Sequence, residues 1–150
     1  MRWFVVIIFL LSSCSGYEEP YVVGVNNIRV NEMNIRNLDI SADLRVHNPN
    51  PFGLDLSRTA LSIYTDDRLI GTIDQAYETI MPGSSDFNLP IDIKLQLSNI
   101  YDGDVMKAVA LGNKILTDRQ ITIVLKGYLY AGKDEVQLKI PIDREEVVEL

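Results

Sequence analysis

The chain has 150 residues, of which 47% are hydrophobic and 23% are charged, a composition typical of a globular protein with room for one buried core. Its 14 basic and 21 acidic residues give a net charge of −7. Because no basic cluster is present to neutralise phosphates, the composition argues against nucleic acid as a partner and against electrostatic binding to an anionic membrane. A single cysteine excludes an internal disulfide, so packing alone must stabilise the fold.

Residues 1–13 predict a cleaved signal peptide. A lone arginine, Arg2, precedes the apolar run WFVVIIFLL at residues 3–11. At about 1.5 Å per residue, this run would span less than half of the roughly 30 Å hydrocarbon core as a helix. A short apolar run after a positive start is typical of a secretory signal rather than of a membrane span.

The end of this leader resembles a bacterial lipobox, in which an aliphatic residue and two small residues precede a cysteine: Leu11, Ser12, Ser13 and Cys14. The resemblance implies cleavage before Cys14 and diacylglycerol on its sulfur, so the thiol would be an attachment point and no nucleophile. Acyl chains contribute about 0.8 kcal/mol per buried methylene, and two or three of them anchor a protein essentially permanently. An incidental cysteine in a discarded leader is the alternative interpretation.

Residues 14–20 are then a lipidated cysteine and a polar tether, and residues 21–150 are the folded domain. The six residues SGYEEP reach roughly 20 Å at most, so we expect the domain to lie close to the membrane. Ser15, where other lipoproteins carry aspartate, resembles lipoproteins forwarded to the outer membrane. We therefore expect a lipid-anchored protein of a bacterial cell envelope, in the outer rather than the inner membrane.

From Tyr21 onward the apolar residues alternate as they do in β-strands. The clearest run, residues 87–97, places six apolar side chains on one face and predicts a half-buried strand. Shorter runs of the same kind cover residues 40–46, 61–63, 69–73, 121–129 and 136–142. Only residues 98–112 show helical spacing, so we predict one helix that ends at Gly112. Strands that do not alternate with helices exclude a parallel α/β fold and favour an antiparallel sandwich with a helical crossover.

The motif Asn48, Pro49, Asn50, Pro51 and Phe52 follows the strand that ends near residue 46. A residue before proline is pushed out of the helical region, and asparagine side chains bond to nearby backbone. We interpret the motif as a rigid structural corner that turns its phenylalanine inward. A ligand-binding loop is the alternative, since rigid exposed turns can serve that role.

With this motif the chain resembles the late embryogenesis abundant type 2 family, also called the water stress and hypersensitive response domain. Residues 23–30 look like the family's first strand, residues 38–52 are similar to its signature, and residues 54–71 look like its next hairpin. The resemblance implies a seven-stranded antiparallel β-sandwich, fibronectin type III or immunoglobulin-like, with one helix. It also implies no enzyme activity and a role in protecting proteins or membranes under stress.

The residues themselves offer no convergent catalytic or metal-binding set. His47 is the only histidine, and we interpret it as a solvated residue at a strand end. The stretch from Asp102 to Asp104 begins like a calcium loop, but residues 105–110 (VMKAVA), among them Lys107 and Val109, carry no side-chain oxygen for the further ligands that such a loop needs. We therefore predict no catalytic residues, no metal and no cofactor, and an enzyme with an unrecognised site is the least favoured hypothesis.

Two functional hypotheses remain. One is a membrane-anchored envelope lipoprotein with a non-enzymatic stress-protective or binding role. The other is an adaptor module that binds a lipid in a groove between the sheets or a protein at an edge strand. A packed interior would count against lipid binding, and an open apolar slot of several hundred Å³ would favour it. We expect a monomer in both cases.

Overall fold

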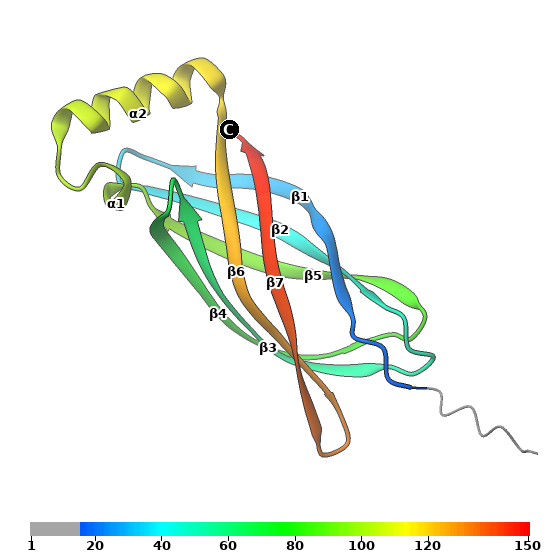
Figure 1. Cartoon of the computed structure of the whole chain (residues 1–150). Coiled ribbons are helices and arrows are strands. Elements are labelled where there is room, and N and C mark those ends of the chain that lie inside the picture. The colour runs from blue at the N-terminus through cyan, green and yellow to red at the C-terminus, as the bar shows by residue number, and fades with distance from the viewer. Residues whose placement is uncertain (1–15) are drawn as a thin grey trace, which may run out of the picture.

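The computed structural model describes residues 16–150, apart from the side chains of Ile115 and Leu116. The signal peptide predicted at residues 1–13 and the anchor predicted at Cys14 lie outside this range. Within it, Figure 1 shows the elements in chain order: β1 (Tyr21–Met33), β2 (Asn37–Asn48), β3 (Leu54–Thr65), β4 (Arg68–Met81), β5 (Ser85–Gln96), α1 (Ser98–Tyr101), α2 (Val105–Asp118), β6 (Gln120–Lys133) and β7 (Val136–Glu149). No helix of this part of the chain is long and apolar enough to cross a bilayer.

All seven strands are antiparallel and lie in one curled sheet in the order β1-β2-β5-β4-β3-β6-β7. The predicted all-β class and the strand number are confirmed, whereas the two-sheet sandwich is not. The sheet is continuous because β4 and β5 pair at Gly71 and Leu95. A Cβ at Gly71 would lie only 2.6 Å from the carbonyl oxygen of Lys94, so the absence of a side chain permits this close approach. Farther along, the Tyr77 hydroxyl donates to the Pro90 carbonyl at 3.1 Å.

The core lies on the concave face of the sheet, where the alternating apolar side chains of β2 to β7 are buried. The edge strand β1 has no buried side chain in that core, and three register shifts interrupt its pairing with β2. The opposite edge strand, β7, contains Pro141, and Pro90 lies in β5 beside the gap to β4. Prolines at these places agree with the expectation that a residue without an N–H group avoids a central ladder.

The helical segment differs from the single helix predicted to end at Gly112. A short helix, α1, comes first, and α2 then continues to Asp118. The Asp104 carboxylate accepts from the backbone N–H of Met106 at 2.9 Å and so caps the start of α2. Its end is set by Arg119, which adopts a left-handed φ of 50° and whose carbonyl accepts from the N–H of Leu150 at 2.7 Å.

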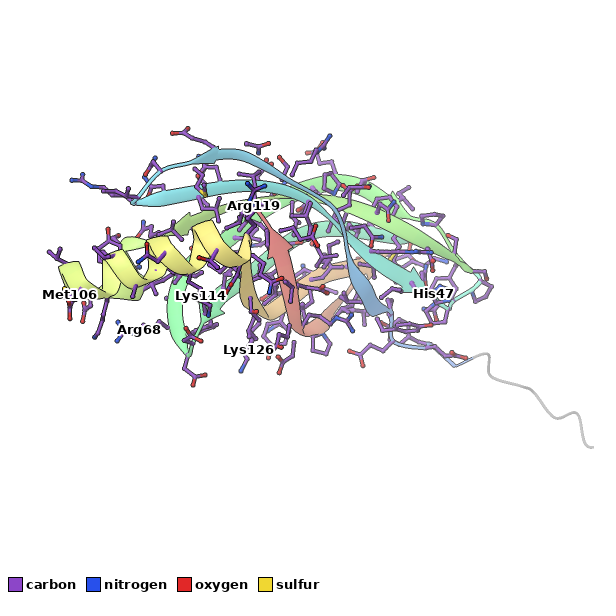
Figure 2. All side chains as sticks on the ribbon, turned by 90° about the horizontal axis from the view of Figure 1, so that it is seen from above. His47, Arg68, Met106, Lys114, Arg119 and Lys126 are labelled. Carbon is purple, nitrogen blue, oxygen red and sulfur yellow. The ribbon has the colours of Figure 1, made fainter. Side chains whose placement is uncertain are left out.

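The molecule is elongated and has two distinct ends (Figure 1). The helices, the turn between β1 and β2 and the C-terminus lie at one end, which we call the helix end. Residue 16 and the corner formed by residues 48–53 lie at the other, the corner end. Figure 2 shows Met106 and Arg119 at the two ends of α2, and His47 near the corner end. Strands of 12 to 14 residues separate the two ends by about 40 Å.

Candidate functional site

An apolar cavity of about 450 Å³ lies at the helix end. Three segments far apart in the sequence form its wall: the turn between β1 and β2, the segment from the end of β5 into α1, and one face of α2. Its lining residues are Met33, Asn34, Ile35, Leu97, Tyr101, Val105, Ala108, Val109, Leu111 and Gly112.

The helix α2 covers this cavity without filling it. Val105, Ala108, Val109 and Gly112 follow the spacing i, i+3, i+4, i+7 and therefore share the helix face that lines the cavity. None of the α2 side chains that the structure describes is buried, and Val105 remains 73% exposed. An apolar helix face normally packs against a core, so this face lacks its usual partner.

Gly112 leaves the middle of this helix face without a side chain. It lies inside α2 and lines the cavity. A Cβ placed on it would meet nothing within 4 Å. Glycine destabilises a helix interior relative to alanine, and no close backbone contact requires it here. The space under α2 is thus open in part because position 112 carries no side chain.

The two polar side chains in the lining bond to other groups of the protein, and the Asn34 Nδ2 group donates to the Glu32 carboxylate at 3.5 Å. The Asn34 Oδ1 atom accepts from the N–H groups of Arg36 and Asn37, each at 2.9 Å. The Tyr101 hydroxyl donates to the carbonyl of Ile35 at 3.3 Å. The remaining lining residues are apolar or glycine. The cavity therefore presents a hydrocarbon surface to an incoming ligand and offers no group suited to catalysis.

At the corner end, the asparagines of the motif are almost fully buried, with Asn48 at 0% and Asn50 at 2% exposure. The Asn48 Nδ2 group donates to the carbonyls of Phe52 at 2.9 Å and Pro82 at 3.1 Å. Its Oδ1 atom accepts from the Asn50 N–H at 3.1 Å. Phe52 is half-buried, and the Lys133 ammonium lies 4.4 Å from its ring centroid. These contacts join the corner to the loops beside it.

The Asn50 side chain also fixes the segment that precedes β1. Its Oδ1 atom accepts from the Glu18 N–H at 2.8 Å, and its Nδ2 group donates to the Glu18 carbonyl at 2.6 Å. The next residues follow the surface, and Pro20 is buried. Burial, and after it the Glu19 carboxylate, raises the pKa of Tyr17. The segment expected to be a tether up to residue 20 is therefore attached to the domain at Glu18. We call this pair of hydrogen bonds the Asn50 clamp.

His47 is not the solvated residue expected from the sequence. Its Nδ1 atom lies 2.6 Å from Oδ1 of Asp86, and the Arg45 Nε group donates to Oδ2 of the same carboxylate at 2.9 Å. These partners, His47 first and Arg45 second, lower the pKa of Asp86. The ring of Tyr21 lies 5.2 Å from the imidazole. No serine or threonine hydroxyl bonds to His47 among residues 16–150, so a catalytic triad is not assembled there.

The acidic residues do not form a metal site in the described part of the chain, where no group of three or more histidine, cysteine, aspartate or glutamate side chains could hold an ion. Asp104 is engaged as the cap of α2, and Asp102 ends α1 in a left-handed conformation. The cavity, the Asn50 clamp and the contacts of Asp86 with His47 and Arg45 are features that the sequence did not predict.

The sequence is similar to a known protein family and to an archaeal protein. Residues 43–146 match the family described as late embryogenesis abundant protein, LEA_2. An uncharacterized protein of Methanocaldococcus jannaschii is 25% identical over 140 residues, which cover 91% of this chain and 74% of that protein.

The solved structures of similar fold include a plant protein and part of a glycosidase. A protein of Arabidopsis thaliana solved in solution has a TM-score of 0.65 at 16% identity, covering 95% of this chain and 89% of that one. A β-glucuronidase of glycoside hydrolase family 2 has a TM-score of 0.51 at 9% identity, covering 85% of this chain but only 11% of the glucuronidase. At such identities the likeness shows a shared fold and carries no activity with it.

Proposed function

Since the chain belongs to the late embryogenesis abundant family LEA_2, we propose that it is a non-enzymatic domain that protects or binds other molecules, anchored in a bacterial cell envelope by a lipid on Cys14. The family match over residues 43–146 carries the first part of this proposal. The lipobox-like sequence from Leu11 to Cys14 carries the second. Ser15 favours the outer membrane over the inner one.

The absence of enzyme activity is supported by the family, whose members are generally non-enzymatic. It is also supported by the side chains near His47. The imidazole bonds to Asp86, and within residues 16–150 no nucleophile bonds to the imidazole. A general base without a nearby nucleophile does not support acyl transfer.

The same proposal includes a two-layer description of the fold, like that of a fibronectin type III domain. Strands β1, β2 and β5 would form one layer, and β4, β3, β6 and β7 the other. The support is that β4 and β5 share a single residue pair, Gly71 with Leu95, whereas β2 and β5 pair along their whole length.

The anchor can be tested in a bacterium that expresses the full chain. Labelled palmitate should enter the wild-type protein, and Cys14→Ala should remain an unlabelled, uncleaved precursor. Ser15→Ala is the matched control and should still be labelled. Palmitate incorporation into Cys14→Ala would refute the anchor and leave the proposal for the domain intact.

The protective role has its own test, in which an unrelated enzyme is dried and rehydrated in the presence of the protein. More enzyme activity should survive than with the same mass of serum albumin. Equal survival would refute protection of proteins as the function.

A binding module is the second candidate function, and the cavity at the helix end favours it. Its volume of about 450 Å³ lies within the range of roughly 300–1,000 Å³ that ligand pockets occupy. The edge strands are less suitable for a partner strand. The bulges of β1 disturb its free edge, and β7 contains Pro141 and several acidic side chains. Binding would therefore use the cavity rather than an edge.

A further inference from the structure

We propose that the cavity beneath α2 binds the hydrocarbon chain of a long-chain fatty acid, with the carboxylate of the ligand at Arg36. The inference rests on the second candidate function, the binding module, and names its ligand class. It uses only the helix end of the molecule, so it stands or falls independently of the lipid on Cys14.

The chemistry of the lining selects an apolar ligand. Asn34 and Tyr101, its two polar side chains, are occupied by backbone groups and by the Glu32 carboxylate. A sugar, a peptide or a nucleotide placed there would lose its hydrogen bonds to water without replacement, and such a loss opposes binding. A hydrocarbon chain has no hydrogen bonds to lose, and its transfer from water to this surface is favourable.

The size of the site selects a small ligand over a second protein. Ten residues line the cavity, whereas a stable protein interface uses roughly 20–30 residues from each partner. A second copy of the chain would therefore cover this face without gaining the area that a stable dimer needs. The concave wall also suits a chain inserted beneath α2 better than a flat protein surface.

Arg36, the cation next to the lining residues Asn34 and Ile35, favours an anionic head group. Arg36 directly follows two lining residues, Asn34 and Ile35, and its side chain is exposed. Within residues 16–150 its guanidinium forms no ion pair. Its backbone is fixed, because its N–H donates to Asn34 and its carbonyl accepts from the N–H of Leu97 at 2.7 Å. An exposed arginine next to the lining residues of an apolar cavity is complementary to a carboxylate.

The attachment of α2 offers a route of entry. The helix is joined to α1 at its start, and at its end the Arg119 carbonyl accepts from the N–H of Leu150. Between these points no described α2 side chain is buried, so little packing opposes an outward movement. Gly112 in the middle of the cavity-lining face leaves room for a ligand chain where a larger side chain would occupy it.

Calorimetric titration of the full chain with palmitate, below the concentration at which it forms micelles, tests this assignment. We expect saturable binding of one palmitate per chain. Gly112→Leu would fill the space under α2 and should weaken binding at least tenfold. Ala110→Leu makes the same kind of change on an exposed part of α2 outside the lining and should leave binding unchanged. Equal affinities of these two variants would overturn the cavity as the site.

A second pair of variants tests the cavity independently, in case Gly112→Leu does not fold. Val105→Asp places a carboxylate in the lining at the first residue of α2, where the helix dipole favours an acidic side chain. Met106→Asp is its matched control, because Met106 is 77% exposed and does not line the cavity. We expect at least a tenfold loss of palmitate affinity in the first variant and less than a twofold change in the second. Equal effects would contradict the proposal.

The head group is tested by Arg36→Gln. This variant should bind palmitate several-fold more weakly and bind the uncharged alcohol hexadecanol as the wild type does. Equal weakening of both ligands would overturn the role of Arg36. The last experiment measures binding to phosphatidylglycerol vesicles. Vesicle binding that is sensitive to Gly112→Leu, without palmitate binding, would identify a membrane phospholipid as the ligand and overturn the choice of a free fatty acid.

Discussion

Gly112 offers the sharpest test of how α2 is built. The residue lies inside the helix on the face that lines the cavity, and an added Cβ would have no neighbour within 4 Å. Gly112→Ala should therefore stabilise the protein, because alanine loses less backbone freedom on forming a helix and no clash offsets the gain.

Two contributions set the expected gain in the free energy of unfolding. Replacing an interior helix glycine with alanine contributes about 1 kcal/mol. In Gly112→Leu, burying roughly half of the leucine side chain in the open cavity contributes about 1 kcal/mol more. At 150 residues, each kcal/mol raises the melting temperature by about 2–4 °C. We expect a rise of about 3 °C for the alanine variant and about 6 °C for the leucine variant.

Thermal melting followed by far-ultraviolet circular dichroism, together with urea unfolding, measures both values. Ala110→Leu is the control, since an exposed substitution on α2 should change stability by less than about 0.5 kcal/mol. A lower melting temperature for Gly112→Ala would refute the reasoning, because it would mean that residue 112 is not helical or that the space beside it is filled.

Two further predictions concern the corner end. Asn50→Ala should lower the free energy of unfolding by about 2–3 kcal/mol in urea, since three side-chain hydrogen bonds are lost. In a chain shortened to begin at Tyr21, Asn50→Ala should lower the free energy of unfolding by less, because the bonds to Glu18 are already absent. An equal loss in the full and the shortened chain would show that the Glu18 contacts contribute nothing. Asp86 has a lowered pKa, so its contribution to stability is present above its unfolded pKa of about 3.9 and is lost as the pH falls through its folded pKa. Asp86→Asn should therefore be less stable than the wild type at pH 7, and the difference in free energy of unfolding should shrink as the pH falls; a difference that does not shrink on acidification would contradict the ion pair as its cause.

The strands were predictable because alternation reports burial directly. The alternating apolar residues of the run at 87–97, in β5 and directly after it, lie in the core or pack against it. The last residue of α2 was not predictable by the same kind of rule. A glycine often follows the last residue of a helix, yet Gly112 lies inside α2, and the left-handed residue that ends this helix is Arg119. Asp66 and Asp67 likewise both adopt positive φ, as an Asn-Gly turn would, because aspartate tolerates this conformation.

The candidate site was less predictable than the fold. Its lining comes from residues 33–35, 97–101 and 105–112, and no periodicity within one segment indicates that the three meet. The Asn50 clamp joins residues 32 positions apart through a backbone group, which any residue type could supply at position 18. The sequence predicted a rigid corner at the asparagines but held no signal for the segment it binds.

The Asn50 clamp has a consequence for access to the cavity if Cys14 carries a lipid. The free part of the tether then runs only from Cys14 to Glu18 and extends about 14 Å at most. The corner end therefore stays within about that distance of the leaflet that holds the lipid. If the long axis of the domain stands perpendicular to the bilayer, the mouth under α2 lies about 40 Å farther out. In that orientation an amphiphile could not pass directly from that leaflet into the cavity. It would have to arrive through the aqueous phase or from a surface opposite.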